Sequence, residues 1–362
     1  MTQMYGKHPA FRVKEYAPYN GEPPLELLRT AFFTPEELFF ARNHGAVPEI
    51  DAGAFRIRVR GKVRNELELS LRELQENFPA HTRAVTLQCA GNRRAELAAM
   101  APIPGELPWE AGAIGTAEWR GTTLRDVLRT AGVELEAGHV AFTGLDEVER
   151  HGQRFPFGGS IPLEKALGSE TLLAYEMNRT PLAPVHGFPL RAIIPGYIGA
   201  RSVKWLAEVR VQETPSDNYF YDRAYQLFPA QARAETVDWA SGIKLGELPV
   251  NSVICSPQDG QQVSGSPLRV QGFAISGGRR IARVDVSGDG GQTWVTAELG
   301  SEDNPWTWRL WETSLELRPG LAEIVARAWD TATNSQPHAV QQTWNFKGYM
   351  NNAWHRVRVV RE

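Results

Sequence analysis

The pattern of hydrophobic and polar positions changes near residue 245, which indicates that two kinds of structure follow one another along the chain. In the first part, residues 56–63 (RIRVRGKV) alternate arginines with Ile57 and Val59. A period of two is typical of a strand with one buried face. We therefore predict a half-buried strand at this point.

Three helices are predicted in the first part. Residues 70–78 (SLRELQENF) place apolar side chains on one helical face, and Ser70 with Glu73 has the spacing of a capping box. Residues 123–132 (TLRDVLRTAG) repeat this spacing and end at a glycine, which often terminates a helix. The third helix is expected within residues 160–168 (SIPLEKALG). Helices and strands together, with long loops between them, predict a mixed α+β domain.

Short strand-like runs separated by Gly, Pro, Asp and Asn make up the second part of the sequence. In residues 281–287 (IARVDVS), Ala282, Val284 and Val286 alternate with polar side chains. The GDGG that follows tolerates positive φ, as a hairpin turn requires. Several short strands with regular turns predict an immunoglobulin-like β-sandwich.

The length agrees with two domains, because 362 residues exceed the size at which a single hydrophobic core usually stops growing. The change of pattern places their junction within residues 240–252. We therefore predict an α+β domain over residues 1–245 and a β-sandwich over residues 246–362.

Composition excludes several classes of partner. The chain has 39 basic and 42 acidic residues and a net charge of -3, so no basic surface for nucleic acid is predicted. The sequence has no apolar run long enough to span a bilayer, and its N-terminus lacks the apolar core of a secretory signal. The prediction is a soluble protein with no nucleic acid and no membrane span, cytoplasmic as the sequence stands, or periplasmic if a leader was removed.

Cys89 lies in TLQCAGNRRAE (residues 86–96), and the only other cysteine is Cys255, so a disulfide framework is not expected. The Cys89 thiol can be a small buried hydrophobic group, or a nucleophile activated by His81 or His186. A structural zinc site would need further thiols or a paired histidine motif, and the sequence has neither. A single thiolate can also bind a soft transition metal whose other ligands come from an organic cofactor.

The neighbours of Cys89 favour a ligand site. Gly91 lets the backbone approach a ligand closely, and the guanidinium groups of Arg93 and Arg94 suit oxyanions or phosphates and lower the pKa of a nearby thiol. A second basic, glycine-broken loop spans residues 186–205 and suits a phosphate or a polar heterocycle. Its basic side chains are His186, Arg191, Arg201 and Lys204.

Four long motifs resemble those of the sulfite oxidase family: TLQCAGNRRAE, WEAGAIGTAEWRGTTLRDVL (109–128), LLAYEMNRTPLAPVHGFPLRAIIPGYIGARSVKWL (172–206) and SGGRRIARVDVSGDGGQTW (276–294). The likeness runs from about Phe40 to the C-terminus. It implies a molybdenum and molybdopterin-binding domain followed by an immunoglobulin-like dimerisation domain, and hence a homodimer. The activity that it implies is the oxidation of sulfite to sulfate by oxygen-atom transfer.

The resemblance also implies roles for individual residues. Cys89 matches the thiolate ligand of molybdenum, beside the two sulfurs of the pterin dithiolene, and Gly91 is expected to make room for the cofactor. Arg93 matches no family contact and is expected to lie on the solvated surface. The residues that match cofactor contacts are Phe40, Ala41, Arg42, Asn43, His44, Asp146, His186, Arg191, Ser202, Val203 and Lys204.

The implied substrate pocket is an arginine-rich oxyanion site, which here consists of Arg42, Arg94, Trp109, Tyr225 and Lys347. Two positions depart from the family. Lys347 replaces an arginine, and so keeps the charge but loses the planar fork that grips an oxyanion. Ala224 stands where vertebrate members have an aspartate, which is expected to make the pocket more positive. The spacing from Cys89 to Trp109 also differs from the family's by one residue.

Vertebrate members carry an N-terminal haem domain, and the residues before Phe40 are too few for one, so we expect no haem in this chain and an external electron acceptor such as cytochrome c. Nitrate reduction is the alternative activity, because nitrate reductases share the cofactor domain and the cysteine. A non-enzymatic binding protein is the third hypothesis, and it predicts a protein without molybdenum.

Overall fold

Two five-stranded sheets build the first part of the protein, whose computed structural model describes residues 4–150, 152–265 and 267–362. One sheet has the order β10-β9-β6-β5, with β11 also paired to β9. Its strands are β5 (Ala80–Gln88), β6 (Ile114–Thr123), β9 (Leu172–Met177), β10 (Thr180–Pro181) and β11 (Arg191–Ile193). The other has the order β4-β3-β12-β7-β8 and consists of β3 (Arg56–Gly61), β4 (Leu67–Ser70), β7 (His139–Arg150), β8 (Gln153–Pro162) and β12 (Leu206–Gln212).

Short helices connect these strands: α1 (Leu25–Leu28), α2 (Leu71–Asn77), α3 (Arg94–Ala98), α4 (Leu124–Ala131) and α5 (Leu163–Ala166). The predicted capping box is present at α2, where the Glu73 N–H donates to Ser70 Oγ at 3.1 Å. The α4 helix begins at the Thr123 cap, as predicted. The third helix is shorter than predicted because Ser160 and Ile161 belong to β8, and a residue before proline is disfavoured in the helical region.

Single helical turns and two small hairpins complete the first part. The N-terminal hairpin pairs β1 (Arg12–Tyr16) with β2 (Tyr19–Glu22), and β13 (Gln226–Leu227) pairs with β14 (Ile243–Lys244). The single turns of this part are η1 (Met4–Gly6), η2 (Glu36–Leu38), η3 (Pro184–His186), η4 (Gly199–Arg201), η5 (Phe220–Ala224) and η6 (Trp239–Ser241), and a further turn, η7 (Val340–Gln342), lies in the second part.

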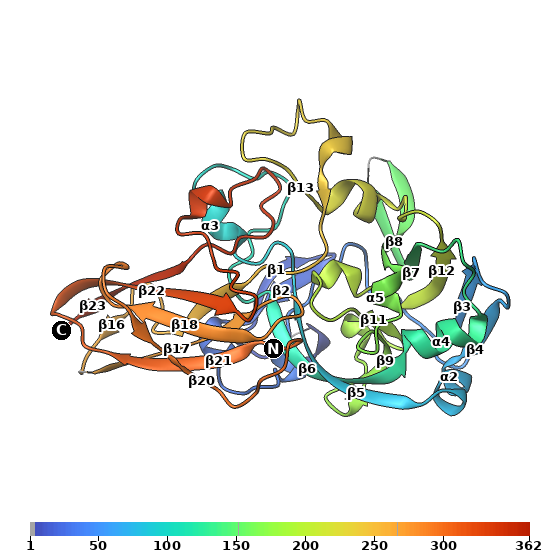
Figure 1. Ribbon diagram of the computed structural model, residues 1–362, viewed down its shortest axis with the longest axis horizontal. Helices are drawn as coiled ribbons and strands as arrows, with labels where there is room; N and C mark the ends of the chain where they lie inside the picture. The colour runs from blue at the N-terminus through green and yellow to red at the C-terminus, as the bar shows by residue number, and fades with distance from the viewer. Residues whose placement is uncertain (1–3, 151, 266) are drawn as a thin grey trace.

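The second part is a β-sandwich, which lies beside the mixed first part (Figure 1) and confirms the predicted fold class. One sheet has the order β15-β17-β21-β20, formed by β15 (Asn251–Ser256), β17 (Leu268–Ile275), β20 (Glu298–Leu299) and β21 (Arg309–Leu315). The other has the order β16-β23-β22-β18-β19, formed by β16 (Gln262–Val263), β18 (Ile281–Ser287), β19 (Val295–Thr296), β22 (Gly320–Asp330) and β23 (His355–Arg361).

The predicted hairpin is present, since β18 pairs antiparallel with β19, but its burial pattern differs from the expected alternation. A register shift near Ala282 leaves this side chain exposed. Asp285, one of the polar side chains that alternate with the apolar ones, is fully buried. It is paired there with Arg283 and Arg327, which satisfy its carboxylate.

One hydrophobic cluster spans both parts, and the sandwich has a second cluster of its own. Phe273 and Trp308 of the sandwich belong to the same buried cluster as the core of the first part. The Trp308 N–H donates to Thr86 Oγ1 at 2.7 Å, which ties the sandwich to β5. In Figure 1, α3 lies against the red segment that holds η7, and the two elements are in contact. The sandwich therefore helps to fix the end of β5 and the turn that follows it.

Candidate active site

Cys89 lies directly after β5, where the chain turns toward α3. Its N–H donates to the Ala113 carbonyl at 2.9 Å, and its Sγ accepts from the Gly91 N–H at 3.4 Å. Burial raises the pKa of the thiol, and Arg42 and Arg94 only partly oppose this rise. The expected lowering of the thiol pKa is thus outweighed by burial. A metal that binds here would displace the proton.

Cys89 opens into a cavity to which distant segments contribute. Ala41 and Val203 of the predicted set lie outside it. Ala41 is paired through its backbone with Gly21, and the Val203 carbonyl accepts from the Ala192 N–H at 2.8 Å. The predicted residues that line the cavity are Phe40, Arg42, Asn43, His44, Cys89, Asp146, His186, Arg191, Ser202, Lys204 and Tyr225.

Basic side chains are concentrated in this cavity. Burial lowers the pKa of Arg191 to about 9, and burial with nearby cations lowers the pKa of Lys204 and of His186. Asp146, whose pKa is raised to about 6 mainly by burial, is the only carboxylate among the lining residues of the described chain. Arg191 Nε and Asp146 Oδ1 are buried without a hydrogen-bond partner among the described residues. Such a cavity fits an anionic, hydrogen-bonding ligand, and the phosphate and heterocycle of molybdopterin meet this description.

Lys7, to which the sequence assigned no role, lies behind the cavity. Its side chain is buried, and Nζ donates to the carbonyls of Glu36 at 2.7 Å and Phe39 at 2.9 Å. Nζ also lies 2.8 Å from His186 Nε2. An ammonium can only donate, so Nε2 accepts, and Lys7 fixes the orientation of the His186 ring. Burial lowers the pKa of Lys7 to about 7.

A second cavity adjoins the first, because Arg42 and His44 line both. Tyr225 Oη lies 2.9 Å from His44 Nε2 at this junction. Burial raises the pKa of Tyr225, and burial and nearby cations hold the pKa of His44 well below its usual value. The pair is therefore uncharged at neutral pH. Lys347 and Arg150 also line the second cavity.

Arg94 is held by the backbone of the sandwich part rather than exposed to the cavity. Nε donates to the carbonyls of Lys347 at 3.2 Å and Gly348 at 3.1 Å, and NH1 donates to Leu107 at 2.9 Å. A Cβ on Gly91 would lie 2.5 Å from the Arg94 guanidinium. Gly91 thus makes room for Arg94, which corrects the expectation that it makes room for the cofactor directly.

Glu106 is a further charged residue of the second cavity, and the sequence assigned it no role. Its carboxylate lies 2.6 Å from Lys347 Nζ and 3.4 Å from Arg94 NH2. The pocket is therefore less positive than Ala224 alone led us to expect. The shifted spacing between Cys89 and Trp109 marks the loop that contains Glu106, and is the sequence signal that could have drawn attention to it.

Trp109 lies near Cys89 but reaches neither cavity. It is fully buried in the apolar cluster that contains Cys89, Phe40 and Leu87. Its Nε1 has no hydrogen-bond partner within the described part of the chain. The structure thus places Trp109 behind the cavity wall, packed among apolar side chains.

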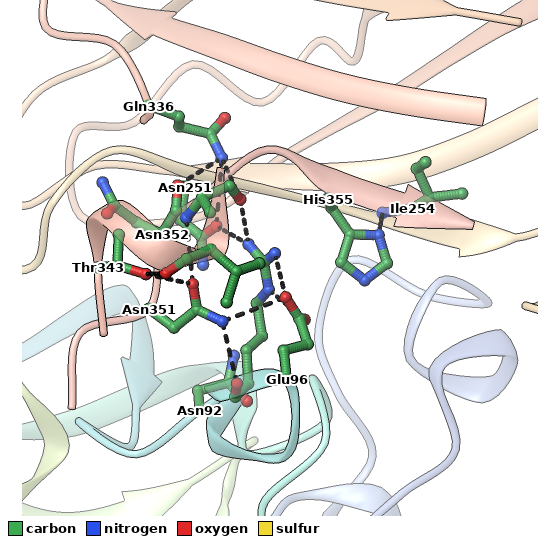
Figure 2. Close-up of polar contacts among 12 residues, drawn as sticks. Asn92, Glu96, Asn251, Ile254, Gln336, Thr343, Asn351, Asn352 and His355 are labelled. Atoms are coloured by element: carbon green, nitrogen blue, oxygen red, sulfur yellow. Dashed lines mark hydrogen bonds and ion pairs between the residues drawn. The ribbon is translucent and has the colours of Figure 1, made fainter. Parts of the chain in front are cut away.

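Arg93 was expected on the surface, but it is fully buried between the two parts of the protein. Its guanidinium pairs with Glu96 at 2.7 Å and donates to Asn251 Oδ1 and the Ala353 carbonyl of the sandwich part at 2.8 and 2.7 Å. Figure 2 shows how the same network links Glu96 to Asn351, whose Nδ2 donates to the carboxylate at 3.1 Å. Arg93 therefore joins the turn after Cys89 to the sandwich.

The arrangement suits a metal that takes one ligand from the protein. Across the described ranges, no three His, Cys, Asp or Glu side chains form a group that could hold a metal ion. A lone Cys89 thiolate next to a basic cavity agrees with an organic chelate that supplies the other ligands.

Within the same ranges, no helix is long and apolar enough to cross a membrane.

Comparisons with known proteins agree with this site. Residues 44–220 match the family model of the oxidoreductase molybdopterin binding domain, and residues 243–362 match that of the Mo-co oxidoreductase dimerisation domain. Sulfite oxidase of Gallus gallus is 46% identical over 97% of this chain and 78% of its own length. Sulfite oxidase of Arabidopsis thaliana is 38% identical over 97% of this chain and 94% of its own length.

Among solved structures, the sulfane dehydrogenase SoxCD from Paracoccus pantotrophus superimposes with a TM-score of 0.79 at 25% identity, over 95% of this chain and 85% of that one. It shares the order of a mixed α+β domain followed by a β-sandwich. The chain belongs to the sulfite oxidase family of molybdenum and molybdopterin-dependent oxidoreductases.

Proposed function

We propose that the protein oxidises sulfite to sulfate by oxygen-atom transfer and passes the electrons to an external acceptor, such as a c-type cytochrome. The observation that supports this most directly is the junction of the two cavities. The Cys89 thiol shares the first cavity with Arg42, His44 and Tyr225, and Arg42 and His44 also face the second cavity with its basic side chains. An oxyanion that enters through the second cavity would meet Arg42 close to Cys89.

The first cavity would hold the cofactor. Cys89 would supply the thiolate, and the pterin and its phosphate would be bound by Phe40, Arg42, Asn43, His44, Asp146, His186, Arg191, Ser202 and Lys204. When bound, the cofactor supplies oxygen-atom transfer and two-electron redox chemistry. The orphaned Arg191 Nε and Asp146 Oδ1 would then gain hydrogen-bond partners.

The chain itself would bind and orient the substrate. Arg42 is a permanent charge at the junction of the cavities, where low dielectric strengthens its attraction for an oxyanion. A neutral His44 with its proton on Nε2 can donate to Tyr225 Oη, 2.9 Å away. The hydroxyl proton of Tyr225 is then free to hydrogen-bond an oxyanion oxygen. This pair orients the anion without adding charge to the site.

Steady-state kinetics of the molybdenum-loaded protein test the proposal. Sulfite is expected to reduce cytochrome c or an artificial acceptor, and nitrate is expected to give no turnover with a reduced dye. Turnover of nitrate without turnover of sulfite would establish the alternative activity. Elemental analysis that finds no molybdenum after expression in a cofactor-competent host would overturn both activities and favour a binding protein.

We further propose a homodimer formed through the sandwich, with the domains divided at residues 245 and 246. A family model named for dimerisation matches residues 243–362, which supports this assembly. Light scattering is expected to give twice the chain mass of 40.3 kDa. A strictly monomeric species at micromolar concentration would contradict the dimer.

A further inference from the structure

We propose that Glu106 is a specificity-determining residue that competes with the substrate anion for Lys347 and thereby weakens the binding of oxyanions at the entrance of the site. This inference rests on the proposed function, because it concerns the affinity of the same site for sulfite and sulfate.

The geometry places Glu106 between two cations that the sequence assigned to the substrate. Glu106 Oε1 lies 2.6 Å from Lys347 Nζ, and Oε2 lies 3.4 Å from Arg94 NH2. The Glu106 and Lys347 side chains are 17% and 18% exposed, and that of Arg94 is 3% exposed. Partial burial protects these ion pairs from screening by salt, so they persist at physiological ionic strength.

Glu106 remains charged in this position. Burial opposes its ionisation, but Arg94 and Lys347 outweigh burial and hold the pKa of the carboxyl below its usual value. Arg42 contributes in the same direction from the junction of the cavities. At neutral pH the entrance therefore contains a fixed negative charge beside the cations that would attract an oxyanion.

The engaged cations have few donors left for a substrate. The Arg94 guanidinium already donates to the carbonyls of Lys347, Gly348 and Leu107, and its remaining side faces Glu106. The Lys347 ammonium is within hydrogen-bond distance of Glu106. An incoming oxyanion must share the Lys347 ammonium with the Glu106 carboxylate, and the repulsion between two anions reduces the affinity of the oxyanion.

The test compares Glu106→Gln with the wild type as molybdenum-loaded enzymes. We expect the KM for sulfite to fall by about tenfold, which corresponds to roughly 1.4 kcal/mol. The competitive inhibition constant of sulfate should fall by a similar factor, while kcat changes by less than about twofold, since the interaction acts on binding. Unchanged or higher values of both constants would overturn the inference.

Glu110→Gln is the matched control. Glu110 lies on the same loop and is also paired with cations, Arg12 and Lys14, but it does not line the second cavity. Its substitution should leave both constants unchanged. An equal fall in the control would mean that net charge alone sets the affinity, and would refute a specific role for Glu106.

Calorimetric titration of sulfate into the same enzymes separates this inference from the proposed function. Tighter sulfate binding in Glu106→Gln, without sulfite turnover in either enzyme, would support the role of Glu106 and refute sulfite oxidation. Sulfite turnover by both enzymes, with the same sulfate affinity in Glu106→Gln as in the wild type, would support sulfite oxidation and refute the role of Glu106. If Glu106→Gln does not fold, Glu106→Ala removes the same charge and should show the same tighter binding.

Discussion

Replacement of Arg93 by alanine should loosen the attachment of the Cys89 turn to the sandwich. Arg93 has a positive φ of 65°, and alanine is strained there to a similar extent, so the comparison isolates the side chain. The variant removes four hydrogen bonds, two to Glu96 and one each to Asn251 Oδ1 and the Ala353 carbonyl. All three partners lose a cationic donor.

The expected loss follows from breaking a largely buried ion pair. Removal of one partner of such a pair costs about 3–5 kcal/mol, because the remaining charge stays without compensation. The Glu96 side chain is 33% exposed, so water can replace part of the lost contact. Asn351 also continues to donate to Glu96. We therefore expect the lower end of the range, about 3 kcal/mol.

Calorimetric melting of the cofactor-free protein measures this loss. A destabilisation of this size should lower the melting temperature by about 4 °C, because the unfolding entropy is about 2.1 cal/mol/K per residue. Hydrogen exchange should accelerate at the backbone amides of Asn351 and Ala353, which lie in the network. The control is Arg72→Ala, since Arg72 forms an exposed ion pair with Glu76 on α2, and its loss should leave the melting temperature unchanged. Equal melting temperatures for the two variants would refute the assignment of Arg93 as the link between the domains.

Three further predictions concern the site. Cys89→Ser should retain the fold, but its sulfite turnover should fall by at least about a hundredfold, because a hydroxyl is a poor ligand for a soft metal. Turnover by this variant at the wild-type rate would exclude Cys89 as the ligand. Lys347→Arg should lower the KM for sulfite severalfold, because a guanidinium can pair with Glu106 and still donate to an oxyanion. An unchanged KM would contradict this role of residue 347. Burial lowers the pKa of Lys7 from 10.5 to about 7, so the unfolded chain binds more protons between these values and stability rises with pH across that window. Lys7→Met should therefore raise the melting temperature of the cofactor-free protein more at pH 6 than at pH 9, and an equal effect at both would show that Lys7 is not buried as a charge.

Local sequence determined the elements whose signals lie within a few residues. The Ser70 and Glu73 capping box and the Thr123 cap satisfy the free N–H groups of their own helices, so they could be predicted without the fold. The alternating runs and turns of the second part likewise predicted the sandwich. The helix predicted within residues 160–168 was too long, because β8 extends through Pro162 by pairing with β7.

The sequence also identified much of the site, because the long motifs mark Cys89 and the basic loop that contains His186, Arg191 and Lys204. These residues line one cavity in the structure. Trp109 belongs to the same motifs, yet the packing places it in the core behind the cavity.

Only the tertiary structure decided how the charges are distributed. Arg93 is buried because its partners Asn251 and Ala353 come from the other domain, more than 150 positions away in the chain. Glu106 meets Lys347 in the same way, at a separation of 241 residues. A sequence pattern reports neighbours along the chain, whereas the burial of a charge depends on which distant group compensates it. Cys89 could therefore be identified from the sequence as the candidate metal ligand, but the charge balance around it is set by the docking of the two domains.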